Sequence, residues 1–435
     1  MTYRTDISSK EKKAIIAIMA LTAIASVFSA LRYGIPFSPD TWTYTDAADS
    51  LMAGNIDAWR TPVYPLVIWL CKAIAGNHYE WLLATLQITA FVATIPLFHK
   101  SAKFAAGNAK VACAATAVFA AIVIESGFCQ FVLSESFAVT LTVVLIYFTT
   151  EFLRRPHTPL ALAICATVLL IVFLRPAQIY VLPIAFFFAA IAAMQRKQCR
   201  KPFVVIALGM CIIGGILFGY ASAFNLQHGV FALTCVNTYN NYYASRFEGI
   251  LSPEAAADNP LLKADIAGFI DQNGLKTESD SVCWNEVTSL ISRHSLAEVN
   301  HMVDNAVSAH RQTWWTSVAR RAASSAVDYR FPTSWIPQFS QRLKPFSIPY
   351  LAVYALLFIF AVVAVAQLHR KASARWYSLI LLTAILGNMT VAIIGAKDDF
   401  DRLLFPSVPI LILIVETILA QIITLVKQKS NSEQI

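Results

Sequence analysis

The sequence predicts an all-α polytopic membrane protein, and three observations support this fold class. Hydrophobic residues make up 57% of the 435 residues and charged residues only 14%, against roughly 45–50% and 25% in soluble globular domains. Apolar runs long enough to cross a bilayer recur along almost the whole chain. The basic residues form short clusters between these runs, as the preference of Lys and Arg for the cytoplasmic side of a membrane predicts.

The order of apolar runs predicts about ten transmembrane helices. The first run, 14–31, follows Lys10, Lys12 and Lys13 and is interpreted as an uncleaved span, although a cleaved signal peptide would have the same pattern. Segment 63–75 is apolar but short, which predicts a re-entrant or interfacial helix that does not cross. Further spans are expected at 81–98, 111–124, 131–152, 160–174, 179–194, 203–224, 348–368, 377–394 and 403–426.

Three parts follow from this order: an N-terminal transmembrane module at 1–224, an extracytoplasmic domain at 225–345, and a C-terminal transmembrane module at 346–435. The middle part is mixed and polar, with helix-like stretches at 252–270 and 281–323. With both termini cytoplasmic, every basic cluster between spans falls on the cytoplasmic side. This holds only if 63–75 does not cross the membrane.

The net charge and the cysteines exclude some functions. The formal charge of +8 forms no basic arm or stripe interleaved with aromatics, so nucleic-acid binding is not expected. The eight cysteines form no C-x-x-C pair and no zinc-site spacing. Cys235 and Cys283 both fall in the extracytoplasmic domain, and an oxidising compartment would permit a disulfide between them. Bridged and free states both remain open.

The loop after the first span, 33–62, contains many acidic, basic and aromatic side chains within a short stretch. It contains Asp40, Asp46, Asp49 and Asp57 together with Trp42, Tyr44, Trp59 and Arg60. Ionisable groups kept at a membrane boundary are costly and are therefore functional candidates. Asp46 and Asp49 begin a helical run that ends near Gly54, so they are interpreted as solvated or capping residues.

Short motifs along the chain occur in an order that resembles a known family. They are PDxxxY at 39–44, RTPxYP at 60–65, LSES at 133–136, LRP at 174–176 and DRLLFPSVP at 401–409. The order is similar to that of the C-type-fold (GT-C) integral membrane glycosyltransferases that use polyprenyl-phosphate sugars, which include protein mannosyltransferases and the lipid A aminoarabinose transferase. The resemblance implies a GT-C-like bundle with a catalytic first periplasmic loop, and it does not extend to the large loop.

The resemblance implies that Asp40 is the catalytic base. Independently, an acceptor hydroxyl needs a carboxylate within hydrogen-bond reach to remove its proton, and the phosphate leaving group needs cations. The candidates for phosphate binding are the isolated cations Arg402, Arg60, Arg175 and Lys397, and anchoring at lipid headgroups is the alternative role for each. The candidates for substrate or acceptor binding are Tyr44, Glu135, Tyr64, Asp399 and Asp401. Glu135 is equally compatible with a structural ion pair.

The expected partners are a polyprenyl-phosphate sugar donor, a lipid, glycan or protein acceptor, and the lipid bilayer of a bacterial cytoplasmic membrane, with the active site facing the periplasm. Inversion at the sugar is implied by the resemblance. Thr41 follows Asp40 where several family members have a second acid. We therefore expect no metal ligands, although a divalent cation remains an alternative.

The alternative function is a transporter or flippase for a lipid-linked glycan. Such proteins place ionisable groups at mid-bilayer, and Glu416, deep in the last span, fits that pattern. A lone buried Glu is more often hydrogen-bonded to a neighbouring helix, which is the expectation here.

Overall fold

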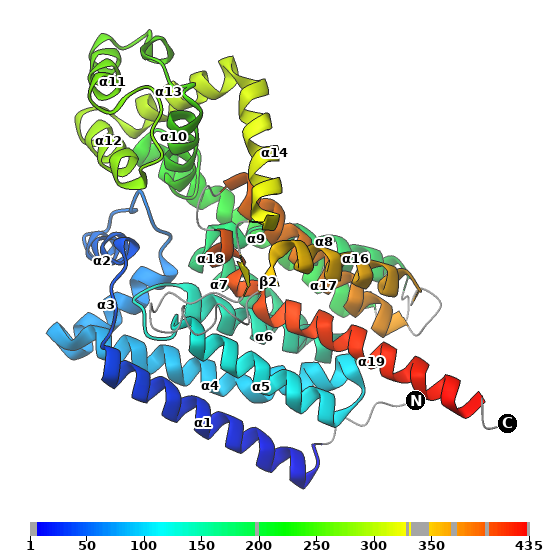
Figure 1. The fold of residues 1–435 in the computed structure, drawn as a ribbon. Helices are drawn as coiled ribbons and strands as arrows, with labels where there is room; N and C mark the ends of the chain where they lie inside the picture. Colours follow the sequence, from blue (N-terminus) through cyan, green and yellow to red (C-terminus); the bar gives the residue numbers. More distant parts are fainter. Residues whose placement is uncertain are drawn as a thin grey trace.

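The structure is a computed structural model that describes residues 7–195, 200–327, 330–331, 348–366, 372–395 and 400–432. Helices dominate this part of the chain. Its strands are β1 (Arg330–Phe331) and β2 (Ile348–Pro349), which pair antiparallel. Long helices lie together in one body, and shorter helices form a second body at one end (Figure 1). The predicted all-α class is confirmed.

The long helices make up the membrane body. They are α1 (Ser9–Tyr33), α3 (Val63–Ala75), α4 (Tyr79–Ala106), α5 (Ala109–Ser126), α6 (Glu135–Arg154), α7 (Thr158–Leu174), α8 (Val181–Gln195), α9 (Arg200–His228), α16 (Tyr350–Ala366), α17 (Ala372–Gly395) and α19 (Val408–Ser432). Eight segments of the described chain are long and apolar enough to cross a membrane, and the shorter apolar helices α7 and α16 add two more. This number agrees with the predicted ten.

Helix α3 does not cross the bilayer by itself. Its 13 residues span roughly 20 Å at the usual rise of about 1.5 Å per residue, less than the roughly 30 Å of a bilayer core. The Tyr64 hydroxyl in α3 donates a hydrogen bond to Gln87 in α4. The two helices therefore run antiparallel around the turn at η1 (Gly76–His78), so α3 folds back on the first half of α4.

Three short elements complete the membrane body. They are α2 (Pro39–Met52), η2 (Pro176–Gln178) and α18 (Phe400–Leu404), which continues through η7 (Phe405–Ser407) into α19. Phe405 packs on Phe128, with ring centroids 4.5 Å apart. This contact joins the last span to the segment that precedes α6, and both aromatic residues are buried.

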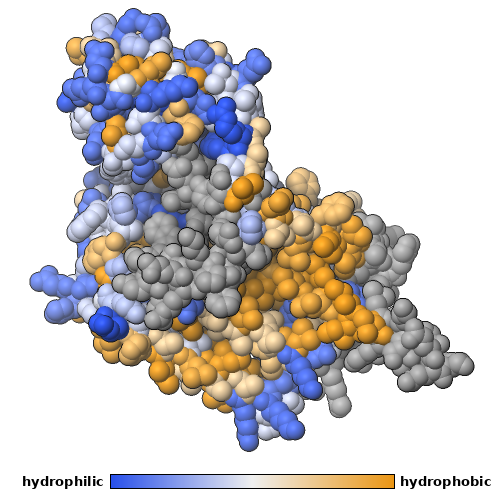
Figure 2. Space-filling view, viewed as in Figure 1, coloured by the Kyte–Doolittle hydropathy of each residue, from blue (hydrophilic) through white to orange (hydrophobic). Residues whose placement is uncertain are grey.

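The second body, here called the head domain (230–327), is helical with its own core. It consists of α10 (Val236–Glu248), η4 (Pro253–Ala256), α11 (Pro260–Asn273), α12 (Asp280–Arg293), α13 (Leu296–Ala309) and α14 (Arg311–Val327). Its surface is mostly hydrophilic, whereas apolar residues cover much of the membrane body (Figure 2). The stretch 281–323, read as one helix-like segment, is three helices, because Ser295 and Glu298 form a capping box that starts α13.

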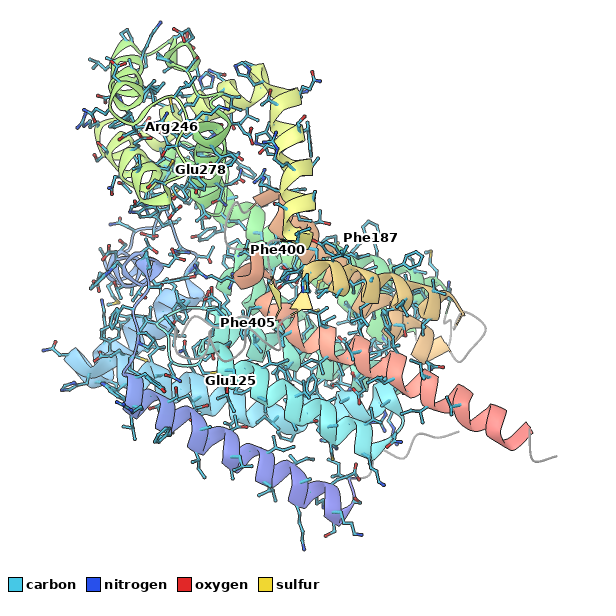
Figure 3. The ribbon with its side chains drawn as sticks, in the orientation of Figure 1. Glu125, Phe187, Arg246, Glu278, Phe400 and Phe405 are labelled. Carbon is cyan, nitrogen blue, oxygen red and sulfur yellow. The ribbon has the colours of Figure 1, made fainter. Side chains whose placement is uncertain are left out.

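The head domain contains a buried ion pair between two of its helices. Arg246, labelled in Figure 3, lies with its Nε 3.0 Å from Oε2 of Glu286, and both side chains are buried. The Tyr242 hydroxyl donates to the same Glu286 oxygen at 2.7 Å. Cys235 and Cys283 are both buried and are not joined by a disulfide, and they belong to separate hydrophobic clusters. Of the two states that the sequence left open, the structure has the one without this bridge.

Candidate functional site

The first turn of α2 fixes the position of Asp40. Ser38 is the N-cap and Pro39 the first helical residue, a combination that favours a helix start. The Thr41 hydroxyl accepts a hydrogen bond from the Ser38 amide at 3.0 Å and donates one to the Val132 carbonyl at 3.2 Å. This contact ties the start of α2 to the segment before α6, so Asp40 is carried by a doubly anchored turn.

Asp40 belongs to a chain of alternating charges, here called the ion chain. Its Oδ1 lies 2.9 Å from Nη2 of Arg60, and its Oδ2 lies 2.5 Å from Nη2 of Arg402. Arg402 Nε donates to Glu135 Oε1, and that oxygen lies 3.0 Å from Nη1 of Arg175. The five residues come from five separate segments, so only the folded chain brings them together.

The ion chain runs from a buried end to a partly open end. The Glu135 side chain is 0% exposed and that of Arg402 is 8% exposed, whereas that of Asp40 is 30% exposed. Arg175 Nη1 and Glu135 Oε2 have no hydrogen bond among the described residues. Three cations and two anions leave one positive charge. The arrangement can therefore accept an additional anion, and Asp40 is its solvent-accessible carboxylate.

The arginines keep Asp40 ionised. Burial acts to raise the pKa of Asp40, but the charges of Arg60 and Arg402 outweigh it and hold this pKa well below its usual range. Burial acts to lower the pKa of Arg60, but the pKa is raised by Tyr44 and Asp40. Asp40 is thus a carboxylate at neutral pH, and its basicity depends on how closely the two guanidinium groups approach it.

Arg60 is held on three sides. Its Nε donates to the Thr43 hydroxyl at 2.7 Å, and its guanidinium carbon lies 4.1 Å from the ring centroid of Tyr44, a cation–π contact. The backbone turn before it is closed by Asp57, whose Oδ1 accepts the amides of Trp59 and Arg60 at 2.8 and 2.7 Å. Burial raises the pKa of Asp57 and outweighs these hydrogen bonds.

Tyr44 contacts the ion chain, whereas Tyr64 is buried behind Tyr44. The Tyr44 hydroxyl lies 2.9 Å from the Ser134 hydroxyl, and its ring faces Arg60. Tyr64 is 0% exposed and packs edge-on behind Tyr44, with ring centroids 4.9 Å apart. The sequence grouped both with the acceptor. The Tyr64 hydroxyl donates a hydrogen bond to Gln87 at 3.0 Å. Tyr64 therefore supports Tyr44 from behind and has no exposed surface.

Three sequence candidates are not among the side chains that the structure describes. Lys397 and Asp399 fall outside the described residues, as does the side chain of Asp401. Asp49 forms an ion pair with Lys72 at 2.8 Å, with 67% of the Asp49 side chain exposed. This agrees with its interpretation as a solvated residue outside the site.

Sequence reasoning assigned no role to Gln87, whose amide donates to the carbonyls of Cys129 and Phe131 at 3.2 and 2.9 Å. The signal that could have identified it is a lone amide inside an apolar span. The bonds brace the segment that leads into Glu135.

Among the described residues, no group of three His, Cys, Asp or Glu side chains could hold a metal ion.

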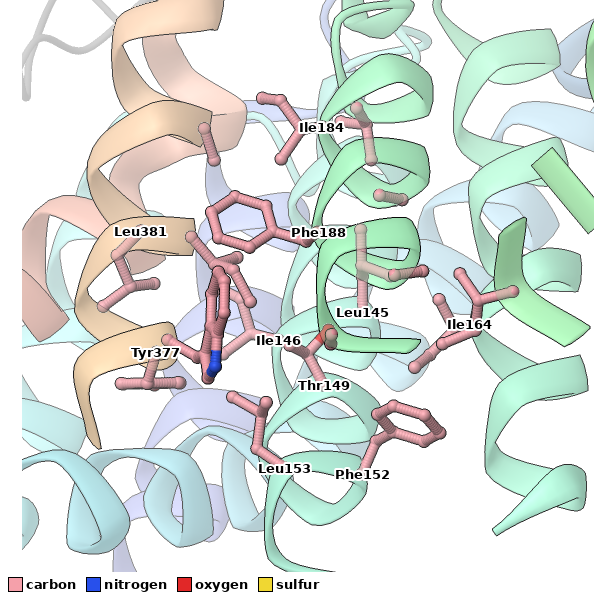
Figure 4. Close-up of a pocket in the computed structure, with 18 of the residues that line it drawn as sticks. Leu145, Ile146, Thr149, Phe152, Leu153, Ile164, Ile184, Phe188, Tyr377 and Leu381 are labelled. Atoms are coloured by element: carbon pink, nitrogen blue, oxygen red, sulfur yellow. The ribbon is translucent and has the colours of Figure 1, made fainter. Parts of the chain in front are cut away.

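An apolar groove lies in the membrane body. Ile184 lines one end, and Phe152 and Leu153 line the other (Figure 4). Tyr180, which follows Arg175 closely along the chain, is also a lining residue. Helices α6, α7, α8, α9, α17 and α19 supply the walls. Along α6 the groove extends from Thr142 to Leu153, roughly 16 Å at about 1.5 Å per residue. Its shape suits a long apolar chain.

Comparison with known proteins gives a structural likeness. No family model and no curated protein sequence matches this chain. A solved structure described as the archaeal oligosaccharyltransferase AglB from Archaeoglobus fulgidus, in complex with an inhibitory peptide and a dolichol-phosphate, is similar with a TM-score of 0.48 and 13% sequence identity. The similarity covers 98% of this chain and 52% of that chain, so this protein spans about half the length of AglB.

Proposed function

We propose that this protein is a C-type-fold membrane glycosyltransferase that moves a sugar from a polyprenyl phosphate to a hydroxyl of a lipid, glycan or protein acceptor. The site faces the extracytoplasmic side, with both termini in the cytoplasm. The observation that carries the proposal is the ion chain: a partly exposed carboxylate from the first loop shares an arginine of the last span with the buried Glu135.

In the proposed reaction Asp40 is the general base. The acceptor hydroxyl attacks the anomeric carbon of the donor, the bond from that carbon to the phosphate oxygen breaks, and the hydroxyl proton passes to the Asp40 carboxylate. Attack from the face opposite the phosphate inverts the anomeric centre. Because the pKa of Asp40 is held low by its arginines, the base gains strength when the donor phosphate draws those guanidinium groups toward itself.

The arginines are proposed to stabilise the leaving group. The polyprenyl phosphate gains negative charge as the glycosidic bond breaks, so cations placed beside it stabilise the transition state more than the bound donor. Arg402 and Arg60 are positioned on either side of Asp40. Arg175, whose Nη1 pairs with Glu135 at 3.0 Å, adds a third positive charge for the phosphate. Glu135 orients Arg402 and Arg175.

The apolar groove is proposed to hold the polyprenyl tail. Tyr180, close in sequence to Arg175, is one of its lining residues, and almost all of the lining side chains are aliphatic or aromatic (Figure 4). A lipid whose tail lies in the groove is proposed to present its phosphate to the arginines of the ion chain.

Replacement of Asp40 tests the proposal most directly. Asp40→Asn should reduce transfer by at least about a thousandfold while the protein still binds undecaprenyl phosphate, because only the proton acceptor is lost. The assay follows transfer from undecaprenyl-phosphate sugars in reconstituted vesicles, with the products identified by mass spectrometry. Asp46→Asn, an exposed acid on the same helix, is the matched control. Equal transfer by Asp40→Asn and the wild type would remove Asp40 from the reaction.

A transporter for a lipid-linked glycan is the second candidate, and Glu416 favours it. This residue is 2% exposed, and neither carboxyl oxygen has a hydrogen-bond partner among the described residues. The expectation that it bonds to a neighbouring helix is therefore wrong. Unpaired acids within a membrane often mark transport paths. Movement of a fluorescent polyprenyl-phosphate lipid across vesicles that is lost in Glu416→Gln but kept in Asp40→Asn would select this function.

A further inference from the structure

The loop that carries Arg60 is hydrogen-bonded to the end of α9 and to the start of the head domain. The Cys235 amide donates to the Ala58 carbonyl at 2.7 Å, and the Ile56 amide donates to Gln227 Oε1 at 3.0 Å. His228 Nε2 lies 2.8 Å from the Ile56 carbonyl oxygen. Segment 56–58 is thus hydrogen-bonded, through its backbone, to the last turn of α9 and to Cys235, which precedes α10.

Aromatic contacts add a second attachment, directly next to Arg60. The Trp59 ring lies against Trp284 of α12 with centroids 4.6 Å apart, and against Tyr239 of α10 at 6.3 Å. Trp284 and Tyr239 are themselves 5.4 Å apart in an edge-on arrangement. Helix α12 lies beside the loop that contains α2 in Figure 1. Two rings from two helices of the head domain therefore pack against the side chain of Trp59.

The Trp59 contact is transmitted to Arg60 through a closed turn. Asp57 Oδ1 accepts the backbone amides of both Trp59 and Arg60, so the two residues are held as one unit. Arg60 then reaches Asp40 at 2.9 Å. A displacement of Trp59 displaces Arg60, and the distance between Arg60 and Asp40 follows.

We propose that the head domain positions Arg60 by holding Trp59, with Trp284 as the positioning residue on the domain side. The functional consequence of this role depends on the proposed function, in which Arg60 binds the donor phosphate. Among the described residues, no hydrogen bond or ring contact joins Trp284 to the ion chain, so its effect on the site passes through Trp59.

The first test is independent of any substrate. In Trp284→Ala, amide hydrogen exchange of peptides that cover 55–62 should become roughly three- to tenfold faster, as expected when one aromatic pair is lost. Trp284→Phe should restore protection, because a ring again faces Trp59. Trp315→Ala, a 54% exposed tryptophan of the same domain, is the control and should leave this segment unchanged. Unchanged exchange in Trp284→Ala would overturn the proposal.

The second test measures binding of undecaprenyl phosphate. Trp284→Ala should weaken binding by a factor similar to its change in exchange, and Arg60→Ala/Trp284→Ala should bind no more weakly than Arg60→Ala alone, since Trp284 acts through Arg60. Additive losses would overturn the proposal. If Arg60→Ala binds as the wild type does, the proposed function of Arg60 fails, while the exchange measurement still decides the positioning role. Trp284→Leu replaces Trp284→Ala if the latter does not fold.

Discussion

At the scale of single residues, the main feature is that Arg402 serves two acids. It lies 2.5 Å from Asp40 and donates to Glu135, so the partly exposed carboxylate and the fully buried one share one cation. Removing one member of a buried ion pair leaves an uncompensated charge and commonly costs about 3–5 kcal/mol. Arg402 is therefore expected to matter for folding as well as for the phosphate, whereas Arg60 affects mainly the open end of the site.

Arg60→Gln should move the acid limb of the pH–rate profile to higher pH. The charges of Arg60 and Arg402 outweigh burial and hold the pKa of Asp40 low, so loss of one charge raises that pKa. A general base must be ionised, hence activity should begin at a pH higher by roughly one unit. The measurement is kcat/KM for the acceptor from about pH 2 to about pH 7, because the pKa of Asp40 lies well below the usual carboxyl range. A limb that stays in place would show that the base is another group.

Asp40→Asn should change the stability with a defined dependence on pH. Because the pKa of Asp40 is depressed in the folded protein, its contribution is present above the unfolded pKa of about 3.9 and is lost as pH falls toward the folded value. The melting temperature of the wild type should exceed that of the variant by a constant margin from pH 7 to about pH 5, and the margin should shrink below about pH 4. A margin that widens with acidification would contradict the ion chain.

At the scale of elements, short segments place the site while long helices support it. The ion chain is supplied by the first turn of α2, the loop before α3, the start of α6, the residue after α7, and α18. These positions are helix ends, where side chains leave the apolar packing. The sequence predicted these ends from the basic clusters and motifs. It did not predict the break inside 281–323, although Ser295-x-x-Glu298 is a readable capping box.

Thr41→Val should loosen the start of α2. The substitution keeps the shape but removes a hydroxyl that accepts from the Ser38 amide and donates to the Val132 carbonyl, and both groups are then left unpaired. The expected cost is about 1–3 kcal/mol in the free energy of unfolding, together with lower transfer. Thr85→Val, in which the hydroxyl bonds only within its own helix, is the control. Equal melting of both variants would show that the anchor contributes nothing.

At the scale of the whole molecule, the sequence predicted which loops lie on the same side of the membrane. It did not predict which charged side chains form ion pairs with one another. Lys and Arg clusters fixed which loops share a side, and this grouped Asp40, Arg60, Glu135, Arg175 and Arg402 in advance. Their alternation depends on helix packing, which no local pattern encodes. For the same reason the sequence did not predict that Tyr64 is buried behind Tyr44, or that the head domain contacts Trp59.

Filling the groove should separate tail binding from phosphate binding. Ala185→Trp places an indole among the groove-lining residues and should lower the affinity for undecaprenyl phosphate by at least about tenfold, because the tail loses apolar contact area. Affinity for a short-chain analogue such as prenyl phosphate should change little. Ala166→Trp, an exposed site on α7, is the control. Equal affinity of Ala185→Trp and the wild type for both lipids would exclude the groove.

The sharing of Arg402 also has a consequence for biosynthesis. Ribosomes synthesise the chain from its N-terminus, so Asp40 and Glu135 are inserted well before the segment with Arg402 is translated. Until that last segment arrives, the partner that joins the two acids is missing. A nascent chain therefore carries no complete site until the segment with Arg402 has been translated and inserted.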